Sequence, residues 1–218
     1  MGKRLLLLAT AAFLINACET SEIKDDYSVE KKTIPAQRVD LKADVASGKI
    51  CTWEAAHSEN EKFLALVNYL RTLPINCGDV QGPATLLVWD PTLANAAQEH
   101  SNDMAINNFL SDNGSFKESD ITAYNLGLKR GSTPKERAKN SGFEGERVIE
   151  NVAKTIAENG DVSDDDIIAG VEELLNTKEG CRNIEDGYVD SLGVAKATRE
   201  INGKTYIYWT QLFGAKKH

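Results

Sequence analysis

The histidines are the residues of this sequence with the most obvious capacity for acid-base chemistry, and there are three of them. His100 stands beside Ser101, and these residue types can act as base and nucleophile in a hydrolase. Both fall in one predicted helix, however, where adjacent residues do not face each other. The apolar stripe of that helix includes His100, which predicts a core histidine. His57 precedes a helix cap and His218 ends the chain, and neither has a visible partner.

Cys51, Cys77 and Cys181 are the cysteines outside the N-terminal segment. They form no Cys-x-x-Cys pair and have no spacing typical of a zinc site, so the default interpretation is structural. An oxidising compartment would allow a disulfide to persist. We therefore expect, as a minimum, one bridge and one remaining cysteine.

The N-terminus has the organisation of an export signal. Lys3 and Arg4 precede an apolar stretch, residues 5–15, that is too short to span a bilayer. Ile15-Asn16-Ala17-Cys18 resembles a bacterial lipobox, in which the cysteine is diacylated and becomes the mature N-terminus. This predicts a signal peptide over residues 1–17 and a lipid on Cys18 that anchors the protein in the cell envelope. The alternative is simple secretion with cleavage near Ala17.

Size and composition predict one globular domain with appendages, because the chain has 218 residues of which 41% are hydrophobic. A net charge of −8 argues against a nucleic-acid partner, which would require a basic surface. Residues 18–50 comprise the lipidated cysteine and a polar, charged spacer. The domain itself is predicted over residues 51–218.

Local patterns predict three main helices, a β-hairpin and one long polar loop. The first helix follows a capping box at Ser58 and stops at Pro74. The others begin at Asp90-Pro91 and after Ser163. The remaining expected features are a strand at Thr85–Trp89, a polar loop over residues 111–145 with a short helix at Pro134–Asn140, and hairpin strands at Val194–Thr198 and Thr205–Phe213 joined by Asn202-Gly203. Bulky residues throughout the last strand predict a central position in its sheet.

In this order, the segments resemble bacterial members of the CAP superfamily (cysteine-rich secretory proteins, antigen 5, pathogenesis-related 1), also called the SCP-like extracellular domain. The resemblance covers residues 61–214 and implies an α+β fold, a three-layer α-β-α sandwich around a small mixed or antiparallel sheet. It is carried by Leu66-Val67-Asn68-Tyr69-Leu70-Arg71, Val88-Trp89-Asp90-Pro91, Asn108-Phe109-Leu110-Ser111, Glu150-Asn151-Val152-Ala153, Cys181-Arg182-Asn183-Ile184 and Tyr208-Trp209-Thr210-Gln211-Leu212-Phe213-Gly214.

The resemblance implies a specific disulfide, because related proteins pair a Cys-Gly after the first helix with the cysteine beside Asn-Ile. In this sequence those residues are Cys77 and Cys181. Cys51 is then the odd cysteine. It could be free, bridge two molecules or replace Cys77 as the partner.

The family's cavity combines two histidines with acidic residues, and this chain departs from that pattern. Asp112 and Gly180 occupy the two histidine positions, and Thr177 lies near the second. Glu150 is the retained member. Without either imidazole we expect no zinc site and no cofactor. Asp112 and Glu150 could instead bind calcium through their oxygens, although we expect Glu150 to hold the neighbouring loop by accepting backbone N–H bonds.

The expected function is therefore that of a non-catalytic binding module on a membrane-anchored lipoprotein. Members of the family have been linked to lipid binding, host contact and, more rarely, proteolysis, so the expected ligand is a protein or a lipid. Residues 111–145 and the cleft around Glu150 are the expected binding surface. The alternative is a protease- or esterase-like hydrolase that uses Glu150 and Asp112 in place of the histidines.

Overall fold

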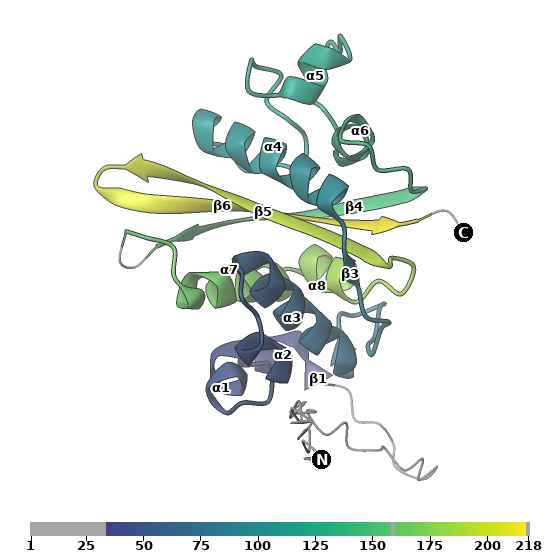
Figure 1. Ribbon diagram of the computed structural model, residues 1–218, viewed down its shortest axis with the longest axis vertical. Helices are drawn as coiled ribbons and strands as arrows, with labels where there is room; N and C mark the ends of the chain where they lie inside the picture. The colour runs from purple at the N-terminus through teal and green to yellow at the C-terminus, as the bar shows by residue number, and fades with distance from the viewer. Residues whose placement is uncertain (1–33, 158–159, 217–218) are drawn as a thin grey trace, which may run out of the picture. The chain divides into compact units, whose positions relative to one another are not determined.

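A mixed four-stranded sheet lies between two layers of helices in this computed structural model, which describes residues 34–157 and 160–216 (Figure 1). Its strand order is β3-β5-β6-β4, with β3 parallel to β5 and the other pairs antiparallel. The α+β three-layer fold is confirmed. The strands are β3 (Val88–Trp89), β4 (Arg147–Ile156), β5 (Ser191–Ile201) and β6 (Lys204–Ala215); the helices above the sheet in Figure 1 are α4 (Pro91–Asn107), α5 (Ile121–Asn125) and α6 (Pro134–Asn140), and those below it include α3 (Glu59–Thr72), α7 (Asp164–Asn176) and α8 (Lys178–Ile184).

The predicted hairpin is present and longer than expected. Its turn residues, Asn202 and Gly203, have φ values of 52° and 74°, which is the left-handed region that a tight hairpin turn requires. β6 lies between β5 and β4, which confirms its central position. Trp209 of β6 packs against Phe63 of α3 with ring centroids 5.7 Å apart, so this strand joins the sheet to the lower helical layer.

The helix caps agree with the sequence patterns. Asp90 and Ser163 accept N–H bonds at the starts of α4 and α7. Ser58 accepts the Glu61 N–H at the start of α3. The Glu61 carboxylate accepts the N–H of His57, one residue before the Ser58 cap, so this end differs in detail from a capping box.

Residues 34–50 are folded, where the composition predicts a spacer. β1 (Ile34–Pro35) pairs in parallel with β2 (Ile75–Asn76), and α1 (Leu41–Ala46) and α2 (Cys51–Glu54) follow. Leu41 is fully buried, and its N–H donates to the Glu172 carboxylate of α7. The elements are too short to produce a clear apolar period, and their burial comes from packing on the rest of the domain. The predicted signal peptide, Cys18 and residues 19–33 lie outside the described residues.

Two elements around the sheet were not predicted by the local patterns. β4 carries Glu150 and Asn151 at buried positions, so its sequence lacks the alternation of a half-exposed strand. α8 begins with Lys178, Glu179 and Gly180, which do not resemble an amphipathic helix. Conversely, the strand predicted at Thr85–Trp89 is shorter in the structure, where β3 comprises only Val88–Trp89.

The long polar segment, residues 111–145, is held to α4 by two carboxylates of that helix, of which Asp103 is buried and Glu99 is partly buried. Asp103 accepts the N–H of Ser115 at 2.7 Å, and Glu99 accepts the N–H of Thr122 at 2.7 Å. These bonds satisfy backbone groups that an irregular segment would otherwise leave to water. α6 confirms the predicted short helix, whereas α5 was not predicted.

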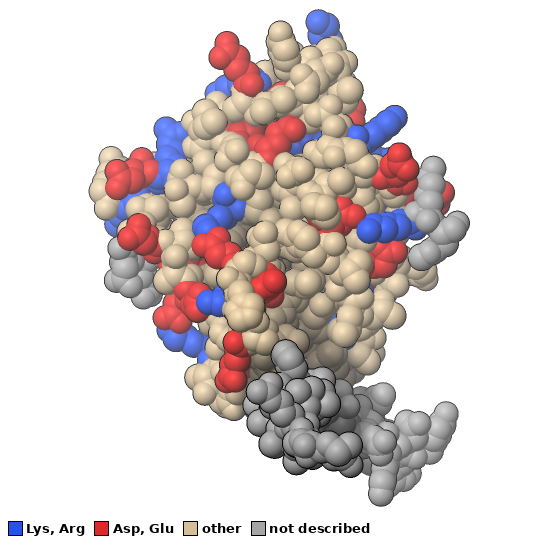
Figure 2. Space-filling view, in the orientation of Figure 1, with Lys and Arg blue, Asp and Glu red and all other residues tan. Residues whose placement is uncertain are grey.

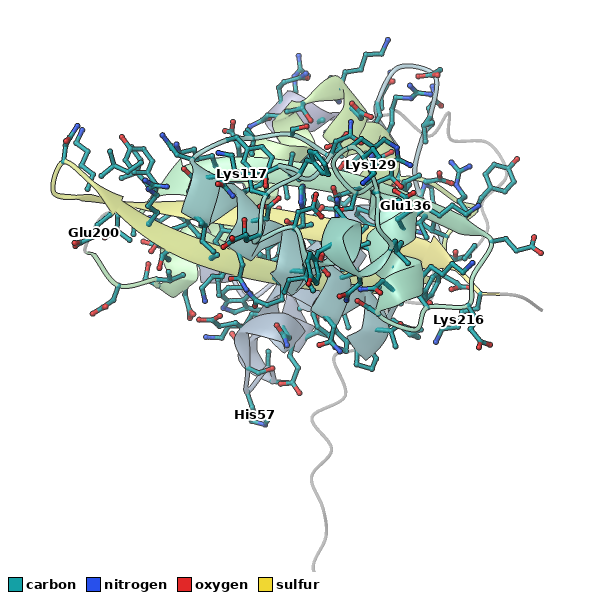
Figure 3. All side chains as sticks on the ribbon, turned by 90° about the horizontal axis from the view of Figure 1, so that it is seen from above. His57, Lys117, Lys129, Glu136, Glu200 and Lys216 are labelled. Carbon is teal, nitrogen blue, oxygen red and sulfur yellow. A yellow bond between two sulfur atoms is a disulfide. The ribbon has the colours of Figure 1, made fainter. Side chains whose placement is uncertain are left out.

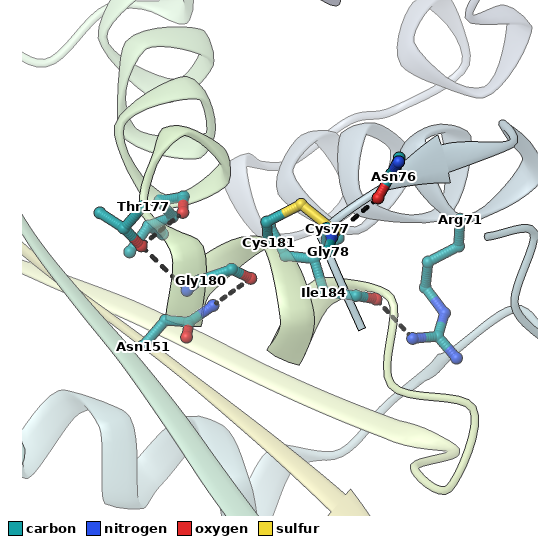
Figure 4. Close-up of a disulfide and its surroundings, with 10 residues drawn as sticks. Arg71, Asn76, Cys77, Gly78, Asn151, Thr177, Gly180, Cys181 and Ile184 are labelled. Carbon is teal, nitrogen blue, oxygen red and sulfur yellow. Dashed lines mark hydrogen bonds between the residues drawn. A yellow bond between two sulfur atoms is a disulfide. The ribbon is translucent and has the colours of Figure 1, made fainter. Parts of the chain in front are cut away.

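Cys77 and Cys181 form a disulfide, with their Cα atoms 5.5 Å apart (Figure 4). The bridge ties the loop after α3 to α8 beneath the sheet. It confirms the predicted pairing and excludes the alternative in which Cys51 replaces Cys77. Cys51 is itself disulfide-bonded, so the alternative in which it is a free cysteine is wrong.

None of the helices in the described ranges combines the length and apolar composition needed to cross a bilayer.

Candidate functional site

Glu150 is buried on the face of the sheet that is covered by α4 and α6. It pairs in register with Leu212 of β6, which packs with Leu93 and Ala96 of α4. The Glu150 side chain is only 1% exposed. A carboxylate at this depth requires a compensating charge or a proton.

Arg137 of α6 supplies that charge. Its Nη2 atom lies 2.8 Å from Oε1 and 3.0 Å from Oε2 of Glu150. The same nitrogen donates to the carbonyl of Asp112, and Nη1 donates to the carbonyl and hydroxyl oxygens of Ser132. One guanidinium therefore joins β4 to both halves of the polar segment. Within the described residues, Glu150 holds that segment through Arg137 and not, as expected, by accepting backbone N–H bonds.

Burial and charge act in opposite directions on Glu150. Burial raises its pKa to about 8, the nearby Asp112 carboxylate adds to the rise, and the Arg137 guanidinium opposes it. Without the guanidinium, the buried carboxyl group could be neutralised only by binding a proton.

His100 of α4 lies beside this pair but is fixed as a neutral core residue. Its Nε2 is 2.6 Å from the carbonyl of Ser111, so Nε2 carries the hydrogen and donates. Burial lowers its pKa to about 3, and Arg137 contributes to the lowering. The 3.6 Å separation from Glu150 Oε1 is consequently not an ion pair at neutral pH. Burial of His100 confirms the prediction from the helical period.

Ser101 is directed away from His100. Its hydroxyl bonds to Thr210 Oγ1 at 2.9 Å and to the carbonyl of Ala195 at 3.2 Å, both within the sheet. The two neighbours therefore make no nucleophile–base pair.

Asp112 is exposed at the edge of the site. Desolvation raises the pKa of its carboxyl group, the charge of Glu179 raises it further, and Arg137 opposes both. The charge of Arg137 therefore acts on the pKa of both Asp112 and Glu150. The sequence predicts the same two residues in one cavity. Asp112 is at the surface, however, and Glu150 is enclosed.

Thr177 and Gly180 build the start of α8 (Figure 4). The Thr177 hydroxyl accepts the Gly180 N–H at 2.9 Å, and the Gly180 carbonyl accepts from Asn151 Nδ2 at 3.3 Å. A Cβ atom on residue 180 would lie 1.9 Å from the carbonyl oxygen of Leu174. A side chain at this position, where the family resemblance implies a histidine, would therefore collide with the backbone of α7.

The site is poorly suited to a metal ion. No group of three or more histidine, cysteine or acidic side chains converges for metal binding in the part of the chain that the structure describes. Both oxygens of Glu150, the one enclosed carboxylate of this site, are taken by Arg137. The arrangement can neutralise charge and fix the polar segment.

Arg137 is the central residue that sequence reasoning missed. It stands in Pro134-Lys135-Glu136-Arg137-Ala138-Lys139, where nothing in the local pattern separates it from its exposed basic neighbours. The one available signal was indirect, because a buried Glu150 without histidines needs another cation.

Comparison with known proteins matches residues 64–213 to the sequence model of CAP, the cysteine-rich secretory protein family. No curated protein is similar to the chain in sequence. Among solved structures, an extracellular protein containing an SCP domain from Bacillus anthracis str. Ames aligns over 72% of this chain and 40% of its own, with 21% identity and a TM-score of 0.49. This chain therefore spans less than half of that protein. An outer surface protein from Borrelia burgdorferi aligns over 82% of this chain and 97% of its own, with 17% identity and a TM-score of 0.47.

Proposed function

Because the chain belongs to the CAP family of cysteine-rich secretory proteins, we propose that it is an envelope lipoprotein that uses its CAP domain to bind a partner without catalysis. The observation that carries this proposal is the pairing of Arg137 with Glu150. An internal guanidinium occupies both oxygens of the carboxylate that could otherwise hold a metal ion or activate water. The same interaction gives the polar segment above it a fixed shape, which suits recognition.

The other polar groups of the site support this proposal. The His100 imidazole is neutral and donates Nε2–H to Ser111, so it offers no proton acceptor on that nitrogen. Asp112 is exposed but has no imidazole or hydroxyl nucleophile bonded to it among the described residues. A conventional hydrolytic site would need at least one such pairing.

A hydrolase remains the second candidate, and one observation favours it. The pKa of Glu150 is raised to about 8, and a carboxylic acid that keeps its proton at neutral pH can serve as a general acid. For this function the site would have to open, because the Glu150 side chain is almost completely enclosed.

A hydrolysis assay separates the two proposals. The full chain is incubated with casein and with p-nitrophenyl acetate, next to Glu150→Gln and, as a control for exposed acids, Glu144→Gln. We expect the three proteins to be equally inactive. Turnover that is lost in Glu150→Gln and kept in Glu144→Gln would establish the hydrolase.

Envelope anchoring is tested on the N-terminus. We expect mass spectrometry of the protein from bacterial membranes to find a diacylglyceryl group on Cys18, and Cys18→Ser to move the protein to the soluble fraction. An unmodified N-terminus beginning after Ala17 would instead support secretion.

A further inference from the structure

The outer edge of β5 is open along most of its length. β3 pairs with β5 only at Ser191 and Leu192, and the other edge of β5 is paired with β6. Beyond Leu192 the outer edge therefore has no strand partner among the described residues. An unpaired edge offers its N–H and C=O groups to another chain, and proteins usually shorten or cover it. This open edge is therefore a candidate interface.

Alternate residues of β5 direct their backbone groups toward this edge. The carbonyl of Leu192 accepts the N–H of Asp90 there. The register with β6 is continuous, so the same direction recurs at every second residue of β5. Lys196 agrees with this alternation, because its carbonyl accepts a hydrogen bond from Gln98 Nε2 of α4 at 2.9 Å and keeps a second lone pair. The N–H and carbonyl of Thr198 consequently face outward as well.

The edge has space beside it for another strand. A groove of about 420 Å³ is lined by residues 194–198 of β5, by Gln98 of α4 and by Glu59 of α3. A second groove of about 290 Å³ continues along residues 197–199. In Figure 1, β5 runs between α4 above the sheet and α3 below it. Thr198 is exposed on this open part of the strand.

Two opposite charges are placed symmetrically about Thr198. Lys196 precedes it by two positions and Glu200 follows it by two, so the three side chains lie on one face of the sheet. This is the lower face, because Lys196 pairs with Glu59 at the start of α3. Glu200 is exposed and belongs to no ion pair among the described residues. Figure 3 shows Glu200 near the tip of the β5–β6 hairpin, which extends beyond the helices.

A second, antiparallel β5 matches these charges in one register. When the two-fold axis passes through Thr198, Lys196 of each copy lies opposite Glu200 of the other. Ala197 then lies opposite Arg199, which gives the long side chain a small neighbour. Registers centred on Lys196 or on Arg199 would instead oppose two like charges, which is destabilising across a pair of strands. The edge is therefore self-complementary about Thr198.

We propose that the outer edge of β5 pairs with the same edge of a second copy of this chain, in an antiparallel dimer centred on Thr198 that joins the two four-stranded sheets into one. The self-complementary charges favour a second copy over an unrelated strand, and a two-fold contact of this kind closes with two copies. Acidic and basic side chains are interspersed over the face in Figure 2, so no field of one sign covers it. This inference goes beyond the proposed binding function and does not depend on it.

A cysteine at the two-fold axis tests the pairing. Facing residues of antiparallel strands have Cα atoms about 4.5–5.5 Å apart, a separation that a disulfide can bridge. The described residues include no free cysteine, so the introduced thiol is the reporter. Thr85→Cys is the matched control, because Thr85 is also exposed but lies in the loop before β3. After mild oxidation of the full chain, we expect Thr198→Cys to form a covalent dimer on a nonreducing gel and Thr85→Cys to stay monomeric.

Charge reversal tests the register. In the Thr198→Cys background, Lys196→Glu or Glu200→Lys alone sets like charges opposite each other, so each should raise the protein concentration needed for half-maximal crosslinking about tenfold. A mixture of these two variants restores opposite charges at both positions and should crosslink as a heterodimer, which mass spectrometry identifies. Lys135→Glu on α6 is the control for the change in net charge and should have no effect. Circular dichroism confirms that each variant is folded.

Equal crosslinking of Thr198→Cys and Thr85→Cys would overturn the dimer, and it is the result expected if an extended segment of another protein occupies the edge. A mixture of the two charge variants that crosslinks no better than either variant alone would overturn the register centred on Thr198.

Discussion

Replacing Arg137 with methionine tests the organisation of the buried site, because it removes the countercharge of Glu150 while keeping most of the side-chain volume. Both side chains of the pair are 1% exposed, so the remaining carboxylate gains little from solvent. Breaking a buried pair by removing one partner costs about 3–5 kcal/mol. The carbonyls of Asp112 and Ser132 also lose a donor, which adds to the cost.

The cost should depend on pH. Without Arg137, the burial that already raises the pKa of Glu150 to about 8 is no longer opposed, so the folded state holds the proton more strongly than the unfolded state does. The unfolded carboxyl group is ionised above its ordinary pKa of 4.5. Stability of the variant is therefore greatest below that pH and falls as the pH rises, since the folded state binds the extra proton.

Urea unfolding of the disulfide-bonded protein, followed by tryptophan fluorescence, measures the unfolding free energy of wild type and Arg137→Met near pH 8 and near pH 5. Arg130→Met is the control, because it breaks an exposed pair with Glu136 and should change little. The double variant Arg137→Met/Glu150→Leu removes both charges and should recover much of the lost stability. A loss for Arg137→Met no larger than for Arg130→Met, or no recovery in the double variant, would refute the reasoning.

Three further predictions concern the lower layer. Burial raises the pKa of Glu185 to about 8 against the opposing charge of Arg71, and neither carboxyl oxygen has a hydrogen-bond partner among the described residues. The folded state therefore binds the proton more strongly than the unfolded state, so the unfolding free energy should fall between pH 4.5 and about 8 by up to about 1.4 kcal/mol per pH unit. Glu185→Gln should remove this slope in unfolding measurements at a series of pH values, and an unchanged slope would contradict the assignment. Replacing both Cys77 and Cys181 with serine opens a loop of 104 positions and should lower the unfolding free energy by about 4.7 kcal/mol in the chain-entropy model; an unfolding midpoint equal to that of the oxidised wild type would exclude it. Gly180→Ala should cost about 1–3 kcal/mol because the new methyl group meets the Leu174 carbonyl, and a neutral effect would show that α8 can shift.

The parts of the fold that could be predicted are those in which local chemistry and packing agree. Asp90 capped α4 and Asn202-Gly203 formed the hairpin turn because both act through their own neighbours. The ordered segment over residues 34–50 was missed because Leu41 is buried by contacts with α7, distant in sequence. Periodicity in short elements carries too few residues to reveal such packing.

The candidate site was predictable only in part, and for a related reason. Glu150 and Asp112 could be named from family motifs, and His100 from the period of its helix. Arg137 could not, because a buried arginine and an exposed one look the same in a short polar helix. Its role depends on the approach of α6 to β4, which the sequence does not specify locally.

Calorimetric titration with calcium and with zinc tests the central claim most directly. If Arg137 serves as the permanent cation of Glu150, the wild-type protein should show no micromolar binding of either metal, and Glu150→Gln should behave identically. Micromolar binding in the wild type that disappears in Glu150→Gln would contradict it, because the carboxylate would then be available to a metal ion despite its guanidinium partner.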